Sequence, residues 1–196
     1  MLVLKDNGGG GLEAGTYLAT CVRVVEMGTQ TERYQQEDPR QVEKVGLMFE
    51  FDKKKTKDGA PYTKTLDVAA SLNNKAALRK YLSSWRGRDF TPEELKGFTL
   101  DKVLGAPALI TINEDGYIKG VAKIMEGQAP EPVQTPIAYL SLDPKEFVKE
   151  DFEALPEWLQ NKVALSPEWT DCISGAVAST AKGPAGKPQP DDDIPF

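Results

Sequence analysis

Alternating apolar and polar positions predict β-strands in the first half of the chain. Residues 16–25 are rich in β-branched and aromatic side chains, which predicts a long first strand that Gly28 either ends or bulges. Residues 29–43 are polar and are predicted to be a loop. A basic turn over residues 53–61 leads into a third strand over residues 62–70. The second strand has an apolar residue at every second position, and we expect these side chains in the core: Val45, Leu47, Phe49 and Phe51.

A helical period follows the third strand. Apolar residues recur at intervals of three, four and seven, which predicts a helix over residues 75–85 with Asn73 or Asn74 as its N-cap. Thr91 and Glu94 have the spacing of a capping box and predict a second helix start. The apolar stripe of the first helix consists of Leu78, Tyr81, Leu82 and Trp85.

Two further strands complete the first domain, residues 12–126. Residues 108–112 and 117–124 are joined by an Asn-Glu-Asp-Gly sequence, which is a strong hairpin signal. Five strands with a helix between the third and fourth match the OB-fold, a partly open Greek-key barrel that often binds oligonucleotides. We therefore expect a mainly β protein with an OB-fold-like five-stranded barrel and an inserted helix. A small barrel without such a ligand is the alternative.

The chain changes character after residue 126. Residues 127–173 begin as a proline-rich linker and continue as short amphipathic helices, which we expect to pack on the barrel or on another subunit because they are too short to fold alone. One helical face carries Leu155, Trp158, Leu159 and Lys162. Residues 1–11, with four consecutive glycines, are predicted to be flexible, and residues 174–196 to be a disordered acidic tail.

The net charge of −6 is distributed unevenly. Residues 12–126 carry 18 Lys/Arg against 17 Asp/Glu, whereas residues 127–196 carry 5 against 12. Within the first part, residues 53–88 hold 10 basic residues and only Asp58 and Asp67 as acids. A basic segment joined to an acidic tail is typical of a nucleic-acid-binding domain with an interaction arm.

Catalytic and metal-binding chemistry has little support in the sequence. The chain has no histidine, and Cys21 and Cys172 lie far apart in unrelated contexts, which indicates reduced thiols. The glycines at positions 8–11 match no phosphate-binding loop. We therefore expect no enzymatic activity, no cofactor and no metal. The absence of a membrane-spanning run and of a signal-peptide pattern predicts a cytoplasmic location.

Binding of a single strand needs cations for phosphates and flat side chains for bases. The aromatic candidates are Tyr34 and Tyr62, with Tyr117 in the hairpin, while Trp85 either stacks on bases or belongs to the core. The candidates for phosphate contacts are Lys53, Lys54, Lys55, Lys57, Lys64, Arg79, Lys80, Arg86 and Arg88.

The last six residues have the features of a peptide ligand. An apolar pocket would take the terminal aromatic ring, the proline limits the entropy lost on docking, and a basic rim would take the carboxylates. The partner-binding residues that we predict are Asp191, Asp192, Asp193, Ile194, Pro195 and Phe196. The DDDIPF ending resembles the C-terminal tip of bacterial single-stranded DNA-binding proteins.

Four other stretches resemble a family of small bacteriophage single-stranded DNA-binding proteins, and the resemblance covers most of residues 12–170. They are Glu13–Tyr17, Tyr81–Phe90, Leu155–Trp158 and Ser166–Trp169. The resemblance implies an OB-fold and sequence-tolerant coating of single strands in phage DNA replication, recombination or repair, in the cytoplasm of a bacterial host. It implies partners at the tip: a helicase, nuclease, recombinase or annealing protein. Because residues 127–174 have no counterpart in the bacterial proteins, a homotetramer does not carry over.

An alternative function fits the same tip. A decoy or interaction protein would use the DDDIPF ending to occupy host replication and repair factors without binding DNA. The basic segment over residues 53–88 favours DNA binding over this alternative.

Overall fold

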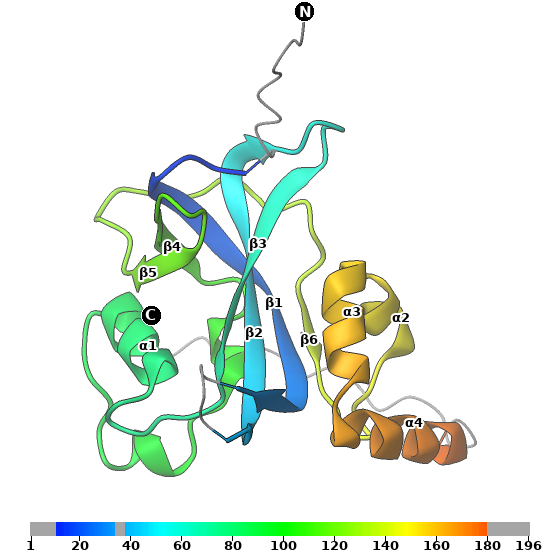
Figure 1. Ribbon diagram of the computed structural model, residues 1–196. Coiled ribbons are helices and arrows are strands. Elements are labelled where there is room, and N and C mark those ends of the chain that lie inside the picture. The colour runs from blue at the N-terminus through cyan, green and yellow to red at the C-terminus, as the bar shows by residue number, and fades with distance from the viewer. Residues whose placement is uncertain (1–10, 34–37, 180–196) are drawn as a thin grey trace, which may run out of the picture.

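The computed structural model describes residues 11–33 and 38–179, and its strands form one six-stranded sheet (Figure 1). The strands are β1 (Gly15–Glu32), β2 (Arg40–Lys55), β3 (Pro61–Ala69), β4 (Pro107–Ile112), β5 (Ile118–Ala122) and β6 (Ala138–Leu140). The main path of the sheet runs β3-β2-β1-β4-β5 with antiparallel neighbours, and β6 pairs with β1 in parallel. The predicted mainly β fold is therefore confirmed.

Helices lie on both sides of this sheet. They are α1 (Ala77–Arg86), α2 (Lys149–Glu153), α3 (Glu157–Ala164) and α4 (Pro167–Ser179), with short 3₁₀ turns at Glu94–Lys96 and Leu100–Val103. Figure 1 shows α1 on one side of β1 and β2 and the α3–α4 pair on the other. The inserted helix and the short C-terminal helices are thus confirmed. No helix in the described ranges is long and apolar enough to cross a membrane.

The first strand is longer than predicted and organises the sheet. β4 pairs with its beginning, from Gly15 to Thr20, and β2 pairs with it from Ala19 to Glu32. Gly28 bulges the strand with a φ of 64°, and a Cβ there would lie 2.5 Å from the Ser166 hydroxyl oxygen. Much of the predicted loop over residues 29–43 is therefore strand. The polar pattern did not predict these strands, because the hydrogen bonds of a hairpin join backbone groups whether or not the side chains are buried.

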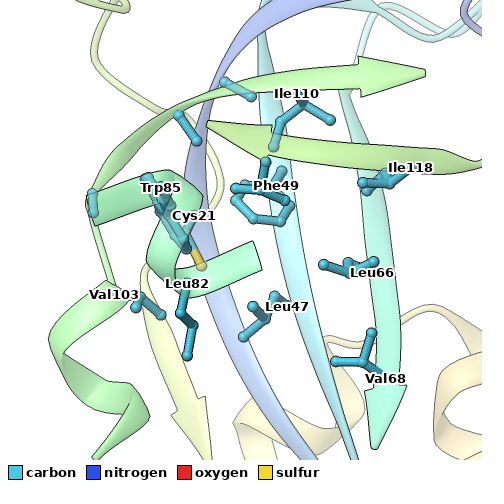
Figure 2. Packing of buried hydrophobic residues seen from close by; sticks show 14 of the residues in the cluster. Cys21, Leu47, Phe49, Leu66, Val68, Leu82, Trp85, Val103, Ile110 and Ile118 are labelled. Atoms are coloured by element: carbon cyan, nitrogen blue, oxygen red, sulfur yellow. The ribbon is translucent and has the colours of Figure 1, made fainter. Parts of the chain in front are cut away.

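The first core cluster fills the face of the sheet that α1 covers. Apolar residues of β2 and β3 meet α1 there, and Figure 2 shows Leu47, Phe49, Leu66 and Val68 pointing into one cluster with Trp85 and Ile118. Trp85 is 1% exposed, and its indole N–H donates to the Pro107 carbonyl at 2.7 Å. Trp85 therefore belongs to the core and has no free face for a base.

The second core cluster lies on the opposite face, under the C-terminal segment. The sheet contributes Val22, Val25, Met27 and Met48, and the C-terminal segment contributes Leu140, Leu142, Leu155, Leu159, Val163 and Cys172. Lys162 also forms an ion pair with Asp67 of β3. Trp158, which the sequence pattern places on the same helical face as Leu155 and Leu159, is 51% exposed, and the buried stripe consists of Leu155, Leu159 and Val163.

The predicted five-stranded barrel is not confirmed. The sheet has six strands where five were predicted, and it is not closed: among the described residues no ladder joins its edges, β3 and β5. The additional strand, β6, lies in the segment predicted to hold only linker and helices. It is three residues long, which is too short for a periodic pattern, and it forms because Arg23–Val25 offers a free backbone edge.

Local predictions around the helices succeeded in part. Thr91 and Glu94 form the reciprocal capping box, with N–H to oxygen distances of 2.9 and 3.3 Å, although only a 3₁₀ turn follows. The predicted caps of α1 are wrong, since Ala76 occupies the N-cap position and no side chain caps the helix. Helix α4 runs to Ser179, past the predicted start of disorder at residue 174. Residues 1–10 and 180–196 lie outside the described residues.

Candidate nucleic-acid interface

The three lysines after Asp52 belong to β2 rather than to a turn. The pairing of β2 with β3 shifts between Glu50 and Lys55, where four residues of β2 lie opposite one residue of β3. Lys53 takes a left-handed φ of 56°, the only positive φ of a non-glycine residue in the described chain. Consecutive residues of a strand already point to opposite faces, and such a bulge changes which face each lysine reaches.

Lys54 reaches the side of the first core cluster. Its ammonium lies 5.3 Å from the centre of the Tyr17 ring, a cation–π contact. The Tyr17 ring packs edge-on against Phe51 at 6.0 Å, and Phe51 packs edge-on against Tyr62 at 5.7 Å. Phe51 is buried, whereas both tyrosines are half-buried, so each keeps part of its ring at the surface.

Lys64 extends the same surface along β3. It lies opposite Phe49 in the register, and paired residues point to the same face of a sheet. We call Tyr17, Lys54, Tyr62 and Lys64 the tyrosine–lysine surface. In the described part of the chain, neither of its lysines has a carboxylate within salt-bridge distance.

Residues 130–135, here called the strap, cross the other side of β2. The Glu131 amide donates to the Asp52 carboxylate at 2.9 Å. The amides of Gln134 and Thr135 donate to the Glu50 carboxylate at 2.9 and 2.7 Å. Lys53 and Lys55 reach this strap: the Lys53 ammonium lies 3.4 Å from the Glu131 carboxylate, and the Lys55 ammonium donates to the Gln134 side-chain oxygen at 3.0 Å.

The basic residues of α1 and its C-terminal turn are largely occupied. Arg86 is buried, pairs with Glu94 and packs on the rings of Phe90 and Phe98, with centroid distances of 4.5 and 5.5 Å. Arg88 also pairs with Glu94, at 2.7 Å. Hydrogen bonds from Arg88, the Thr91 amide and Arg86 hold the pKa of the Glu94 carboxyl well below its usual range.

Arg79 is paired in a similar way. Its guanidinium lies 3.2 Å from the Asp89 carboxylate and also donates to Asn74. This contact, with hydrogen bonds from the Phe90 amide and the Ser83 hydroxyl, lowers the pKa of Asp89 to about 2. Lys80, in contrast, is exposed on the outer face of α1.

The structure thus divides the predicted basic segment. Lys54, Tyr62 and Lys64 come together, whereas Lys53 and Lys55 reach the strap. The arginines and Lys80 lie on α1 and the turn after it, and Figure 1 shows α1 on one side of β1 and β2.

Four predicted sites remain, of which two lie in the described chain and two outside it. Lys57 is exposed in the turn between β2 and β3, and Tyr117, 68% exposed, lies at the β4–β5 hairpin. Tyr34 and the partner-binding residues 191–196 lie outside the described residues.

Tyr17 is the interface residue that sequence reasoning missed. It alternates with Ala19 and Cys21 onto the apolar face of β1, so its face could be predicted from the sequence. Its contact with Lys54 depends on the register of β1 against β2 and on the bulge at Lys53, and neither has a local signal.

Comparison of the chain with protein-family models, with curated proteins and with solved structures found no match. The resemblance to bacteriophage single-stranded DNA-binding proteins therefore stays a prediction from the sequence.

Proposed function

We propose that this protein binds single-stranded DNA without strong sequence preference. The observation that carries the proposal is the tyrosine–lysine surface, where the Lys54 ammonium lies over the half-buried Tyr17 ring and Lys64 shares a face of β3 with the half-buried Tyr62. Neither lysine has a carboxylate partner among the described residues. Phosphates need such cations, and bases of any sequence stack on such rings. Edge-on packing against Phe51 holds both rings in place, which limits the entropy lost when a base stacks.

The terminal hexapeptide supports the second half of the proposal. Its resemblance to the tip of bacterial single-stranded DNA-binding proteins indicates that residues 191–196 recruit replication, recombination or repair proteins. The protein would then coat single strands and bring partners to them, with no catalytic step of its own. Its setting would be the cytoplasm of a bacterial host.

Direct binding measurements separate this proposal from the decoy alternative. Fluorescence anisotropy with labelled oligo-dT should show tight binding at low salt, and a duplex of equal length should bind more weakly. The logarithm of the affinity should fall linearly with that of the salt concentration, by about 0.7 per phosphate contact. Absence of oligo-dT binding at low salt would contradict DNA binding and favour the decoy alternative.

A tip variant tests recruitment separately. Removal of residues 191–196, or Phe196→Ala alone, should abolish binding of a purified helicase, nuclease or recombinase while oligo-dT binding persists. The two variants differ in charge, because only the first removes the aspartates. Partner binding that survives both changes would place recruitment elsewhere in the chain.

A further inference from the structure

The lysine run at the end of β2 reaches two chemically different sides of the sheet. On the strap side, Lys53 and Lys55 contact Glu131 and Gln134, and the carboxylates of Glu50 and Asp52 lie next to them. On the other side, Lys54 contacts only the Tyr17 ring among the interactions of the described chain. A basic triplet in the sequence is therefore not a single cationic patch in the fold.

We propose that the single strand follows the tyrosine–lysine surface, and that Lys53 and Lys55 stay with the strap instead of contacting DNA. In this arrangement Lys54 and Lys64 contact phosphates, and Tyr62 stacks on a base. The inference rests on the proposed function and specifies which side of β2 performs it.

The strap is held too firmly to be displaced at low cost. Glu50 is 8% exposed, and its carboxylate accepts two backbone N–H groups of the strap. If DNA displaced the strap, the Glu50 carboxylate and the two strap amides would lose their hydrogen bonds. Such a loss is costly for a buried charged group. A strand that approached this side would also meet the carboxylates of Asp52 and Glu131.

Tyr17 acts as a positioning residue for Lys54. The ring draws the ammonium toward its face and so restricts where that flexible side chain presents its charge. Tyr17→Leu removes this contact and should weaken DNA binding more than Tyr17→Phe, which keeps the ring under Lys54. Since both variants retain Lys54, the salt slope should stay close to that of the wild type.

The salt dependence of oligo-dT binding tests the assignment. We compare Lys54→Ala, Lys64→Ala and the double variant Lys53→Ala/Lys55→Ala in the full chain, each checked for native folding by near-ultraviolet circular dichroism. Lys54→Ala and Lys64→Ala should each reduce the log–log slope by about 0.7, and the double variant should leave it unchanged. A reduction of about 1.4, two contacts at 0.7 each, in the double variant, with no change for Lys54→Ala, would overturn the inference.

Hydrogen exchange of the strap amides supplies a second readout without any substitution. The amides of Glu131, Gln134 and Thr135 donate to carboxylates, so they should exchange slowly in the free protein. Saturating oligo-dT should leave these three rates unchanged. Faster exchange in the complex would mean that DNA displaces the strap, and would overturn the inference. Failure of the wild type to bind oligo-dT is a different outcome, since it removes the proposed function itself.

Discussion

Two groups of basic residues illustrate how differently a fold can treat similar charges. The lysine group comprises Lys53–Lys55, Lys57 and Lys64 on β2, β3 and the turn between them, and the arginine group comprises Arg79, Arg86 and Arg88 on α1 and the turn after it. The arginines pair with Asp89 and Glu94, acids that lie within ten residues of them in the chain. The lysines that are paired reach the strap, almost eighty residues away.

A charged residue in the sequence is therefore not always available to a ligand, because ion pairs within the fold can occupy it. The arginine group stabilises the turns after α1, since planar guanidinium groups suit carboxylates and aromatic faces. In the lysine group, Lys54 and Lys64 have no carboxylate partner among the described residues. Changes in the arginine group should therefore alter stability, and changes in the lysine group should alter binding.

The largest effect is expected for Arg86→Ala. This change removes a buried partner of Glu94 and the packing on Phe90 and Phe98, and should lower the free energy of unfolding by about 3 kcal/mol. Urea denaturation measures the loss. Lys80→Ala, an exposed position on the same helix, is the control and should leave the midpoint unchanged. An Arg86→Ala variant of native stability that binds oligo-dT more weakly would reverse the assigned roles.

Tyr62→Leu should produce the largest effect on binding. Loss of a stacked base costs about 1–3 kcal/mol of binding free energy, and the salt slope should change little because no charge is lost. Tyr62→Phe retains the ring and its edge-on contact with Phe51, so it should bind like the wild type. Anisotropy measures both variants, and equal affinities for the leucine and phenylalanine variants would argue against stacking at this position.

Acid should weaken the arginine group. The pKa of Asp89 is about 2 in the folded protein against an ordinary 3.8, so the folded state binds fewer protons than the unfolded chain. The stability contributed by the Arg79–Asp89 pair is therefore complete above pH 3.8 and is lost as the pH falls toward 2. Asp89→Asn should flatten part of this decline in urea midpoints measured from pH 5 to pH 2.

Asp58→Asn is the control for the acid experiment. It removes the same charge from the β2–β3 turn, where the described chain provides no arginine partner. The decline should then remain as steep as in the wild type. Similar curves for Asp58→Asn and Asp89→Asn would show that the Arg79 pair does not govern the acid response.

The smallest effect concerns the backbone at Lys53. Its left-handed φ costs a side-chain-bearing residue about 1–2 kcal/mol, part of which glycine would recover. Lys53→Gly should thus be more stable than Lys53→Ala by about 0.5–1 kcal/mol in urea denaturation. Both variants lose the contact with Glu131, so their difference isolates the backbone. An alanine variant at least as stable as the glycine variant would contradict the strain.

The sequence by itself determined the elements whose signals are local. Alternation at Val45–Phe51 located the core of β2, the Asn-Glu-Asp-Gly turn located the β4–β5 hairpin, and the stripe ending at Trp85 located α1. The Thr91–Glu94 capping box was also predictable, because its two hydrogen bonds join residues three apart. Each of these signals depends on neighbours in the chain.

Only the tertiary structure decided which side each candidate residue faces. The bulge at Lys53 decides that Lys54, and not its two neighbours, lies on the Tyr17 side, and the register of β1 against β2 brings Tyr17 beneath it. The strap and β6 find their partners through backbone groups, which carry no side-chain pattern. Such pairings depend on which segments meet in space, and a one-dimensional pattern holds no information about that.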